Sequence, residues 1–401
     1  MNAQKFIKTL PLRIDKQINL AIIYHYFAHY RLPVLEELSH AEMLNITLLG
    51  DQKSDTDIPT IDPDGELSHL HWYSLKNHWL LGGKLLWQGN LLRYCISSKD
   101  DIFIFLGSAY YITTWLAMFI LKIRRKPVLL WTHGVTNDQD GFNWKLRSFF
   151  YGISNGVLLY GNKAKEVMAG KGYPTSELHV IYNSVDHKKQ VEYRNRYNPS
   201  VTKAIRAEFF ENPGDPLLIF IGRLTPQKKL QMLPEVIRKL KDQGESFNLL
   251  LVGDGPERSN LTEQVDALDL SAQIKFYGAC YDEIRVSELV QAADMCISPG
   301  EVGLTAITAL GYGTPVITHD DFNHQMPEYE AIVSGYNGMF FERDNMTALA
   351  DQLITWKDIT KDMSKDEIRT RCFNRIDKYY NPSYQATTIT EIIQSQLKNN
   401  A

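Results

Sequence analysis

Short apolar runs, each closed by a glycine or a polar turn, recur throughout this chain of 401 residues. In the first half they occupy residues 18–27, 45–50, 102–107, 128–134, 156–161 and 178–186, with helical stretches between several of them. After a polar, linker-like stretch at 187–200 the pattern restarts, with runs near residues 217, 247, 274, 295 and 314. Strands that alternate with helices indicate parallel, doubly wound sheets. We therefore predict an α/β chain with two Rossmann-like domains.

The length and the cysteines limit the class of protein further. A chain of this size exceeds one ordinary core, so two domains of about 200 residues are expected. The four cysteines (Cys95, Cys280, Cys296 and Cys372) have no CxxC spacing and lie among apolar or strand-like neighbours. Buried thiols in a reducing compartment are expected rather than disulfides or a metal site. The first 16 residues lack the apolar stretch of a signal peptide, and a cytoplasmic location is predicted.

The first half is basic and contains a stretch suited to a membrane surface. Residues 1–197 carry 23 Lys and Arg against 18 Asp and Glu, whereas the remainder carries 20 against 29. No zinc-finger or RNA-binding signature supports nucleic acid as the partner. Residues 71–95 combine three tryptophans and many leucines with only positive charges. This composition suits peripheral contact with the inner face of a membrane, and equally an amphipathic helix packed on the first sheet.

One uncharged stretch, residues 102–121, is long enough for a spanning helix and has a basic flank. Gly107 and Ser108 divide it, and the apolar run that starts at residue 128 completes a strand–helix–strand unit. We therefore predict a strand and a helix there instead of a membrane span.

The run that starts at residue 217 ends at Gly222 and leads directly into positive charge. Arg223 follows at once, and Lys228 and Lys229 come a few residues later. Glycine lets the backbone approach a ligand closely, and Arg and Lys suit phosphate oxygens. The alternative is a surface loop with solvated charges. Taken with the motifs that follow, the segment predicts an anion site.

Three further glycine-containing turns follow the next apolar runs, at residues 252–257, 276–279 and 298–319. In the last of them, Gly300 and Gly303 flank the start of a helix. Free N–H groups at a helix start, near Arg and Lys, favour a diphosphate. Each turn alone is also an ordinary strand-to-helix connection, and a lone GxG is weak evidence for a nucleotide.

The order and spacing of these motifs resemble the family 4 retaining glycosyltransferases, which have the GT-B fold. The resemblance covers most of residues 128–390 and is strongest over 217–342. It implies that Arg223 and Lys228 neutralise a donor diphosphate, with Lys229 where the family usually has Gly. His133, in WTHG, matches the family's histidine near the donor sugar, although a hydrogen-bonded structural histidine is the alternative.

The resemblance also implies an organisation and an activity. Residues 1–197 would bind the acceptor, 198–375 the nucleotide-sugar donor, and 376–401 would form a helix that crosses back to the first domain. The donor would be linked to UDP or GDP, with dTDP left open. The acceptor would be a hydroxyl of a glycan or a lipid-linked saccharide, as in polysaccharide or lipopolysaccharide synthesis, and neither cofactor nor metal is expected. The implied donor-binding residues are Gly222, Gly253, Asp254, Tyr277, Gly278, Gly300, Val302, Gly303, Leu304, Thr305, Thr308 and Glu328.

The chain departs from the family at its E-x7-E donor motif. Alignment on residues 313–315 places Gly300 and Thr308 at the positions of the two glutamates. Glu301 lies one residue after the position of the first glutamate. In the family the first Glu contacts the donor sugar and the second usually bonds the ribose hydroxyls. Glu301 either takes over the sugar contact, which makes it a catalytic candidate with His133, Arg223 and Lys228, or is a loop carboxylate. Glu328 matches a family Pro-Glu near the nucleotide, or is a solvated carboxylate at a helix start.

Several alternatives stay open. A nucleotide-sugar epimerase shares the fold, and loss of both motif glutamates favours a non-catalytic module that binds a nucleotide sugar or a partner. The absence of a GxGxxG that opens a helix disfavours a dehydrogenase. Three DxD triplets, at residues 55–57, 62–64 and 138–140, lie in polar loops away from the phosphate motifs. We attribute them to chance and expect no metal, because Arg, Lys and a helix start already supply positive charge.

Overall fold

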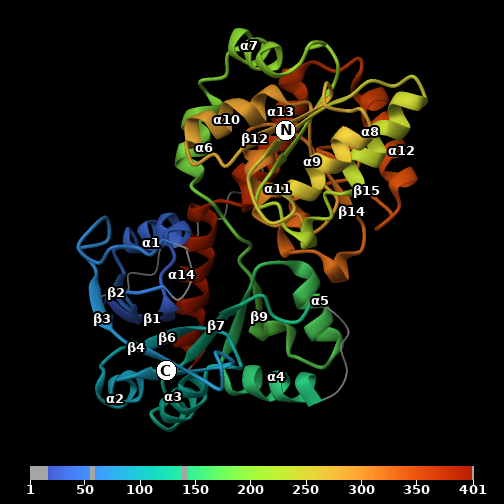
Figure 1. The fold of residues 1–401 in the computed structure, drawn as a ribbon. Helices are drawn as coiled ribbons and strands as arrows, with labels where there is room; N and C mark the ends of the chain where they lie inside the picture. The colour runs from blue at the N-terminus through green and yellow to red at the C-terminus, as the bar shows by residue number, and fades with distance from the viewer. Residues whose placement is uncertain (1–16, 55–58, 137–141, 400–401) are drawn as a thin grey trace, which may run out of the picture. The chain divides into compact units, whose positions relative to one another are not determined.

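The computed structural model describes residues 17–54, 59–136 and 142–399, and Figure 1 shows its ribbon. The contacts within the chain define two compact units. The first comprises Met1–Trp131, Leu146–Asn155 and Thr390–Ala401, and the second comprises Thr132–Lys145 and Gly156–Ile389. The domain boundaries predicted at residues 197 and 375 stay a prediction.

Seven strands form the first sheet, in the order β3-β2-β1-β6-β7-β8-β9. Its strands are β1 (Ile18–Tyr26), β2 (Leu44–Asp51), β3 (His71–Ser74), β6 (Ile102–Leu106), β7 (Val128–Thr132), β8 (Gly156–Leu159) and β9 (Leu178–Val180). The connections contain η1 (His29–Arg31), α1 (Leu32–Ser39), α2 (Leu91–Ser97), α3 (Ile112–Ile123), α4 (Phe142–Ile153), α5 (Asn162–Gly170) and η2 (Thr175–Glu177). The pair β1–β6 at the centre is parallel, and both strands are almost wholly buried. Burial on both faces explains why these runs are continuously apolar.

Six parallel strands form the second sheet, in the order β12-β11-β10-β13-β14-β15. They are β10 (Leu217–Ile221), β11 (Asn248–Val252), β12 (Ile274–Gly278), β13 (Met295–Ser298), β14 (Val316–His319) and β15 (Gly338–Phe341). Counted along the chain, the strand order is that of a Rossmann sheet, and its direction reverses between β10 and β13. The predicted α/β class and doubly wound topology are confirmed.

The helices that accompany the second sheet begin with α6 (His187–Arg194) and α7 (Pro199–Phe209). The others are η3 (Pro226–Lys228), α8 (Met232–Asp242), α9 (Arg258–Ala267), α10 (Glu283–Ala292), α11 (Leu304–Gly311), η4 (Phe322–His324), η5 (Pro327–Ala331), α12 (Met346–Thr360) and α13 (Lys365–Tyr379). The last helix, α14 (Pro382–Asn399), belongs to the first unit from residue 390 on. The polar stretch at residues 187–200, read as a linker from composition, is therefore largely helical. Its helix α6 is polar almost all round and buries only Gln190, so the sequence carries no apolar period there.

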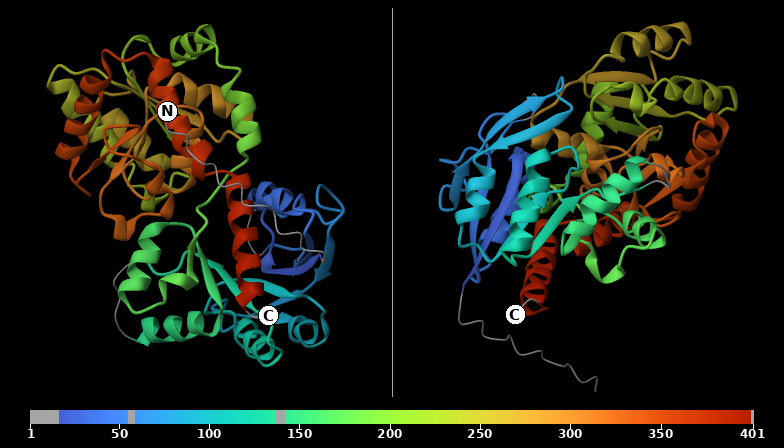
Figure 2. Two further views of the ribbon diagram at one scale, coloured as in Figure 1. Left: turned by 180° about the vertical axis from the view of Figure 1, so that it is seen from behind. Right: turned by 90° about the horizontal axis from the view of Figure 1, so that it is seen from below.

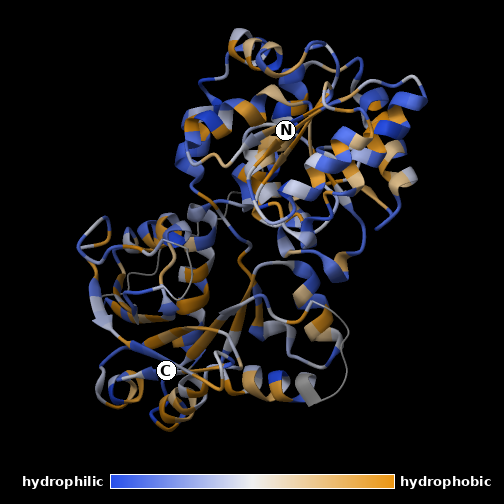
Figure 3. Ribbon diagram, in the orientation of Figure 1, coloured by the Kyte–Doolittle hydropathy of each residue, from blue (hydrophilic) through white to orange (hydrophobic). Residues whose placement is uncertain are grey.

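Alternate residues of the second sheet pack on opposite faces. Leu218 and Phe220 join an apolar cluster with side chains of α8, α9 and α12, whereas Leu217 and Ile219 join a cluster with α10, α11 and α13. The period of two along a strand produces this division. Figure 2 shows helices on both faces of this sheet, and the apolar strands appear orange in Figure 3. Burial on both faces fixes the strands, so the loops at their ends are held in place.

Residues 71–95 differ from the helix that was one interpretation of their composition. They form β3, a hairpin of β4 (Lys76–Leu80) and β5 (Leu85–Gly89), and most of α2. The hairpin turn has positive φ at Leu81, Gly82 and Gly83. Two consecutive glycines at such a turn are the signal that the helical interpretation missed. The helix interpretation of this stretch is therefore wrong.

The uncharged stretch at residues 102–121 divides into β6 and α3, as predicted. Across residues 17–54, 59–136 and 142–399, the structure contains no helix with the length and apolarity needed to cross a membrane. All four cysteines are free thiols; Cys95, Cys296 and Cys372 are buried and Cys280 is partly buried.

Candidate functional site

The loops after β10 and β13 meet at the carboxyl edge of the second sheet, where the strand order reverses. In open α/β sheets this position is where ligands bind, because the two neighbouring connections leave in opposite directions. The loop after β10 contains Arg223 and Lys228, and the loop after β13 contains Gly300 and Glu301. The fold thus brings together two motifs that lie more than 70 residues apart in the sequence.

The turn after β10 is fastened to the turn after β11 by backbone contacts. The N–H of Gly222 donates to the carbonyl of Val252 (3.0 Å), and the N–H of Leu224 donates to that of Asp254 (2.9 Å). Gly253 has a φ of 139°, and a Cβ there would lie 1.9 Å from the Gly222 carbonyl oxygen. Only glycine permits this approach. The exposed Asp254 accepts a hydrogen bond from the N–H of Gly255 through its own carboxylate (2.8 Å).

Arg223 and Lys228 have different surroundings within the same loop. Arg223 is exposed, and its guanidinium makes no hydrogen bond or ion pair with any described residue. Lys228 is partly buried, and its Nζ donates to the carbonyl oxygen of Glu301 (2.5 Å). Burial lowers the pKa of Lys228, whereas the nearby carboxylates of Glu301 and Glu328 oppose that shift. Arg223 is therefore free for an incoming anion, and Lys228 also holds the neighbouring loop.

Gly300 lies against the turn that contains Lys228. Its N–H donates to the carbonyl of Lys228 (3.0 Å), and a Cβ at this position would lie 2.0 Å from the carbonyl oxygen of Gln227. A glutamate could not occupy position 300 without displacing this backbone. This contact accounts for Gly at position 300, where the family motif has its first Glu. The Glu301 carboxylate, one residue on, is partly exposed and makes no hydrogen bond with the described residues.

Two side chains that sequence reasoning missed hold this loop from β14 and the turn after it. The buried amide of Gln325 accepts a hydrogen bond from the N–H of Val302 (2.9 Å) and donates to the Thr318 hydroxyl (2.8 Å). Thr318 in turn donates to the carbonyl of Ser298 (2.8 Å). No local pattern marks these residues, because their role depends on two loops that meet only in the fold.

Helix α11 begins directly after this loop and presents its first turn toward the end of β10. Its N-cap, Gly303, has a φ of 55° and supplies no side-chain cap. The hydroxyl of Thr305 donates to the carbonyl of Ile221 (3.0 Å), which ties the helix start to β10. Leu304, Thr305 and Thr308 are half-buried, so they form the incompletely covered face of the helix. The uncapped N–H groups make this helix start suitable for an anion.

Glu328 is the most deeply buried carboxylate of the site, with 2% of its surface exposed. One carboxylate oxygen accepts a hydrogen bond from the Asn183 side chain (2.7 Å). The other is buried and has no hydrogen-bond partner among the described residues. Burial raises the pKa of Glu328, and the Asn183 bond and Lys228 counteract this. Asn183 lies shortly after β9, so the structure joins two residues that the sequence places 145 positions apart. The interpretation of Glu328 as a solvated carboxylate is wrong.

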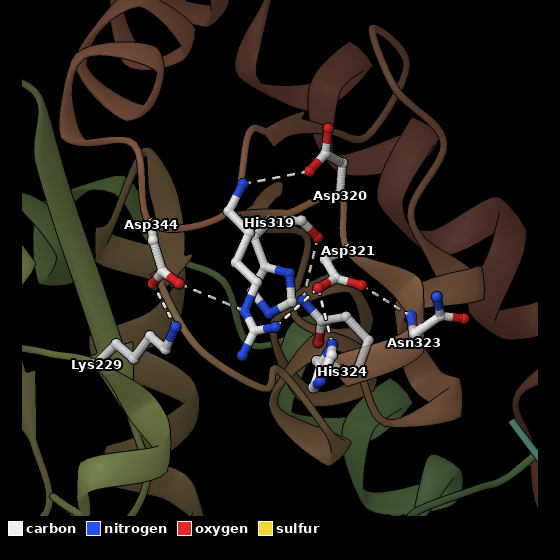
Figure 4. A network of polar contacts seen from close by, with 9 residues as sticks. Lys229, His319, Asp320, Asp321, Asn323, His324 and Asp344 are labelled. Carbon is white, nitrogen blue, oxygen red and sulfur yellow. Dashed lines mark hydrogen bonds and ion pairs between the residues drawn. The ribbon is translucent and has the colours of Figure 1, made fainter. Parts of the chain in front are cut away.

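A chain of polar contacts connects Lys229 to the turn after β14 (Figure 4). The Lys229 ammonium pairs with Asp344, and Arg343 donates to the Asp321 carboxylate (2.7 Å). Lys229 adopts a left-handed backbone with a φ of 52°. The family usually has glycine at this position, and the positive φ supplies the physical reason. The Lys229 side chain is thereby engaged with Asp344 and not with the loop that Lys228 holds.

The other predicted residues are Tyr277, Gly278 and His133. The carbonyl of Gly278 accepts a hydrogen bond from the N–H of Gly253 (2.8 Å), so the end of β12 adjoins the turn after β11. Tyr277 and Gly278 end β12, the edge strand, and Tyr277 lies beside Phe209 (ring centroids 5.9 Å apart) and accepts a hydrogen bond from Arg285 (3.4 Å). His133 follows β7, is exposed, and its ring lies 4.7 Å from that of Tyr160.

Of the three DxD triplets, those at residues 55–57 and 138–140 lie outside the described residues. In the third, the Asp62 carboxylate accepts a hydrogen bond from the N–H of Asp64 (3.0 Å). The described residues include no cluster of three or more His, Cys, Asp or Glu side chains arranged for a metal.

Residues 201–371 match the family model of the glycosyl transferases group 1. Among curated proteins, the chain is 34% identical over 136 residues to a D-inositol 3-phosphate glycosyltransferase of Nocardia farcinica, covering 31% of this chain and 30% of that protein. It is 24% identical over 204 residues to the alpha-monoglucosyldiacylglycerol synthase of Streptococcus pneumoniae, covering 49% and 44% of the two chains. The chain thus spans less than half the length of these relatives.

Solved structures match over nearly the whole chain. HepE of Anabaena in complex with UDP has a TM-score of 0.70 at 17% identity, covering 94% of this chain and all of that one. A glycosyltransferase of Rickettsia africae has a TM-score of 0.73 at 17% identity, covering 96% and 99%. At this identity the likeness establishes the fold. The chain therefore has the GT-B fold, as the resemblance to family 4 predicted, and its residues 201–371 match the family model of the group 1 glycosyl transferases.

Proposed function

We propose that this protein transfers a glycosyl group from a nucleotide diphosphate sugar to a hydroxyl of a glycan or a lipid-linked saccharide, with retention of configuration. The observation that carries the proposal is the meeting of Arg223, Lys228 and the start of α11 at the point where the strand order reverses. An unpaired guanidinium and uncapped helix N–H groups at one edge suit a diphosphate. The curated relatives named above are a glycosyltransferase and a glycolipid synthase, and HepE was solved with UDP, which supports the same class of donor.

The chemistry depends on stabilising the leaving group. The bond between the anomeric carbon and the donor phosphate oxygen breaks, and its electron pair stays on the diphosphate. Arg223 and the N–H groups of α11 would stabilise that growing negative charge. The acceptor hydroxyl attacks from the face that the phosphate leaves, and its proton passes to the departing phosphate oxygen. No side-chain nucleophile is required by this route, so the absence of the two motif glutamates does not argue against turnover.

The departures in the donor motif bear on the nucleotide and the sugar. Thr308, on the partly open face of α11, has a short neutral side chain where the family has a ribose-binding glutamate. The Glu301 carboxylate is free to contact the donor sugar. UDP and GDP are the proposed donor nucleotides, and weak ribose recognition at Thr308 makes a dTDP-sugar a further candidate.

Donor hydrolysis and transfer assays test this proposal. The whole protein would be incubated with UDP-, GDP- and dTDP-sugars, with and without a saccharide acceptor, and release of the nucleoside diphosphate would be measured. Release that increases with acceptor supports glycosyl transfer. Conversion of the donor to its epimer without acceptor would instead identify the epimerase. Binding of a nucleoside diphosphate without turnover of any donor would identify the non-catalytic module.

We further propose that the first unit contacts the inner face of a membrane through its hairpin and α3. The exposed fractions of Leu81 and Ile123 are 73% and 84%, and Trp79 at the hairpin lies against Tyr111 just before α3. The exposed Lys84, Lys122 and Arg125 lie in or directly after these elements. Apolar tips beside cations are the composition of an interfacial surface.

Flotation with vesicles tests the membrane proposal. Anionic vesicles should carry the protein at low ionic strength, and binding should weaken with salt. The double variant Leu81→Asp, Ile123→Asp should float less than the unaltered protein. Ile359→Asp is the matched control, because Ile359 is an exposed apolar residue of α12 in the other unit. Equal loss in both variants, or no binding at low salt, would contradict the proposal.

A further inference from the structure

A cavity of about 390 Å³ lies at the edge of the second sheet opposite the donor loops. Its wall includes Pro216, Met295 and Pro315, which directly precede or begin β10, β13 and β14. The amino ends of parallel strands share one edge, so this cavity lies across the sheet from the donor loops at the carboxyl edge. The helices α7, α12 and α13, labelled in Figure 1, also contribute to its wall. Its volume is within the range of small-molecule sites.

Positive charge predominates in this cavity. Five cationic side chains and one carboxylate, Asp294, form part of its wall; the cations are Arg206, Lys357, Lys361, Lys365 and Arg369. Asp294 is shared between Arg206 (2.6 Å) and Lys365 (3.2 Å), and Lys357 pairs with Glu245 outside the wall. Lys361 is exposed and makes no ion pair with a described residue. The internal partners therefore leave positive charge uncompensated.

Arg369 is the cation that most needs an anionic partner. It is 9% exposed, and its guanidinium lies 3.7 Å from the centre of the Tyr197 ring. Its Nη2 donates to the neutral oxygens of Gln291 (3.1 Å) and Arg194 (3.3 Å), and no carboxylate of the described residues accepts a bond from it. Burial lowers its pKa, while Tyr197 and Asp366 act in the opposite sense. A buried guanidinium held only by neutral acceptors and a ring retains much of its desolvation cost.

The wall of the cavity also contains apolar side chains. They are Met295, Trp356, Met363 and Ile368, and Trp356 is almost fully buried. A ligand that satisfies both kinds of side chain has an anionic head and an apolar body. Inorganic phosphate would leave the apolar wall without contact, and a neutral apolar compound would leave Arg369 and Lys361 without an anion. Three neighbouring carboxylates, Asp358, Asp362 and Asp366, do not form part of the wall.

We propose that this cavity binds a compact amphipathic phosphate monoester, with its phosphate held by Arg369 and Lys361 and its apolar body against Trp356 and Met363. The site is distinct from the donor site and does not depend on the function proposed above. It would be occupied together with a nucleotide donor, because the two sites lie at opposite edges of one sheet.

Titration calorimetry of the full chain with 1-naphthyl phosphate tests the proposal. Saturable binding is expected, with 1-naphthol and inorganic phosphate each at least tenfold weaker. Lys361→Glu should weaken 1-naphthyl phosphate at least tenfold, because it reverses a charge at the cavity without disturbing a buried contact. Lys378→Glu is the matched control, since Lys378 is an exposed lysine of α13 outside the wall. It should change the affinity less than twofold.

The donor nucleotide separates the two sites. A saturating concentration of UDP, or the variant Arg223→Ala, should leave binding of 1-naphthyl phosphate unchanged. Competition by UDP would overturn the proposal by placing the probe at the donor site. Equal weakening by Lys361→Glu and Lys378→Glu would reduce the effect to surface charge and also overturn it. So would the absence of binding at millimolar probe, or equal affinity for 1-naphthol.

Discussion

Arg223 and Gly300 both lie in loops at the carboxyl edge of the second sheet, but they contribute in different ways. Arg223 is exposed and unpaired among the described residues, so its contribution is expected in function and not in stability. Gly300 has no side chain, and its backbone packs directly against the backbone of Gln227 and Lys228. Substitutions at these positions should therefore affect different measurements.

Arg223→Ala should reduce turnover about a hundredfold and leave folding unchanged. The lost charge-assisted contact strengthens as the diphosphate ionises, which corresponds to about 2–3 kcal/mol in the transition state. The rate of nucleoside diphosphate release and the melting temperature would be measured together. Arg238→Ala is the control, because Arg238 is exposed on α8 and pairs with Asp242 of the same helix. Near-normal turnover by Arg223→Ala would refute its role at the diphosphate.

Gly300→Ala should destabilise the protein by about 1–3 kcal/mol, because the new Cβ would overlap the Gln227 carbonyl oxygen. The same displacement of the loop should weaken UDP binding. Gly170→Ala is the matched control, since a Cβ at Gly170 meets no atom within 4 Å. Chemical denaturation would give the free energies of unfolding. Equal stability of the two variants would show that the loop does not need glycine at position 300.

His319 predicts a pH dependence of stability. It is 1% exposed at the end of β14, and burial, reinforced by the nearby Arg343, lowers its pKa from 6.5 to about 4. The unfolded chain therefore binds a proton at His319 between about pH 6.5 and 4, whereas the folded chain does not. Stability is full above pH 6.5 and falls as the pH drops toward 4.

Replacement of His319 should remove that part of the pH dependence. Denaturation of His319→Gln at pH 7 and pH 5 should show a smaller difference in unfolding free energy than the unaltered protein. His40→Gln, at an exposed position on the first unit, should keep the full difference. An unchanged difference in His319→Gln would mean that other groups produce the acid sensitivity.

At the scale of elements, the donor site consists of loops that hold one another. Lys228 bonds the loop after β13, and Gln325 holds the same loop from the turn after β14. Thr305 ties the start of α11 to the end of β10. Each contact joins a different pair of strand ends, so the loop geometry is determined by their combination and not by local sequence.

Gln325→Met should lower stability by about 1–3 kcal/mol and raise the KM for the donor more than it lowers kcat. The change keeps the side-chain length but leaves the N–H of Val302 and the hydroxyl of Thr318 without Gln325 as a partner. Steady-state kinetics and denaturation would measure both effects. Gln243→Met, at an exposed position just after α8, is the control. Loss of stability with an unchanged KM would show that Gln325 supports the fold without positioning the donor loop.

At the scale of the whole molecule, the first unit draws its final element from the far end of the chain. Residues 390–401 belong to the unit that contains β1 and β6. Within it, Gln396 of α14 donates to the carbonyl of Asn155 (3.1 Å), and Ile393 is fully buried. The first unit should therefore be incomplete without the C-terminus.

Ile393→Asp should selectively destabilise the first unit by several kcal/mol, because it buries an unpaired carboxylate in an apolar environment. Hydrogen exchange should show faster exchange in β1 and β6 than in β10 and β13. Lys398→Asp, near the end of the same helix and exposed, should leave exchange unchanged. Uniform acceleration in both units would contradict the assignment of this segment to the first unit.

The sequence determined most of the strands and the order of the motifs. Central parallel strands are buried on both faces, so they appear as continuous apolar runs such as those at β1, β6, β10 and β11. Prediction from the sequence failed where the local composition does not indicate how a segment packs in the fold. The polar helix α6 was missed for this reason. The hairpin of β4 and β5 was missed although Gly82 and Gly83 mark its turn in the sequence. The roles of His133 and Tyr277 stay predictions.

The sequence alone determined that this chain has an anion-binding set of Arg223, Lys228 and a glycine-rich helix start, because residue type and spacing are sufficient to identify it. Only the tertiary structure decided how they act on one another. It placed Gly300 against Gln227, paired Asn183 with a buried Glu328, and turned Lys229 toward Asp344. These outcomes depend on distances between segments up to 145 residues apart, which are set when the sheet and its helices pack and not by any local pattern.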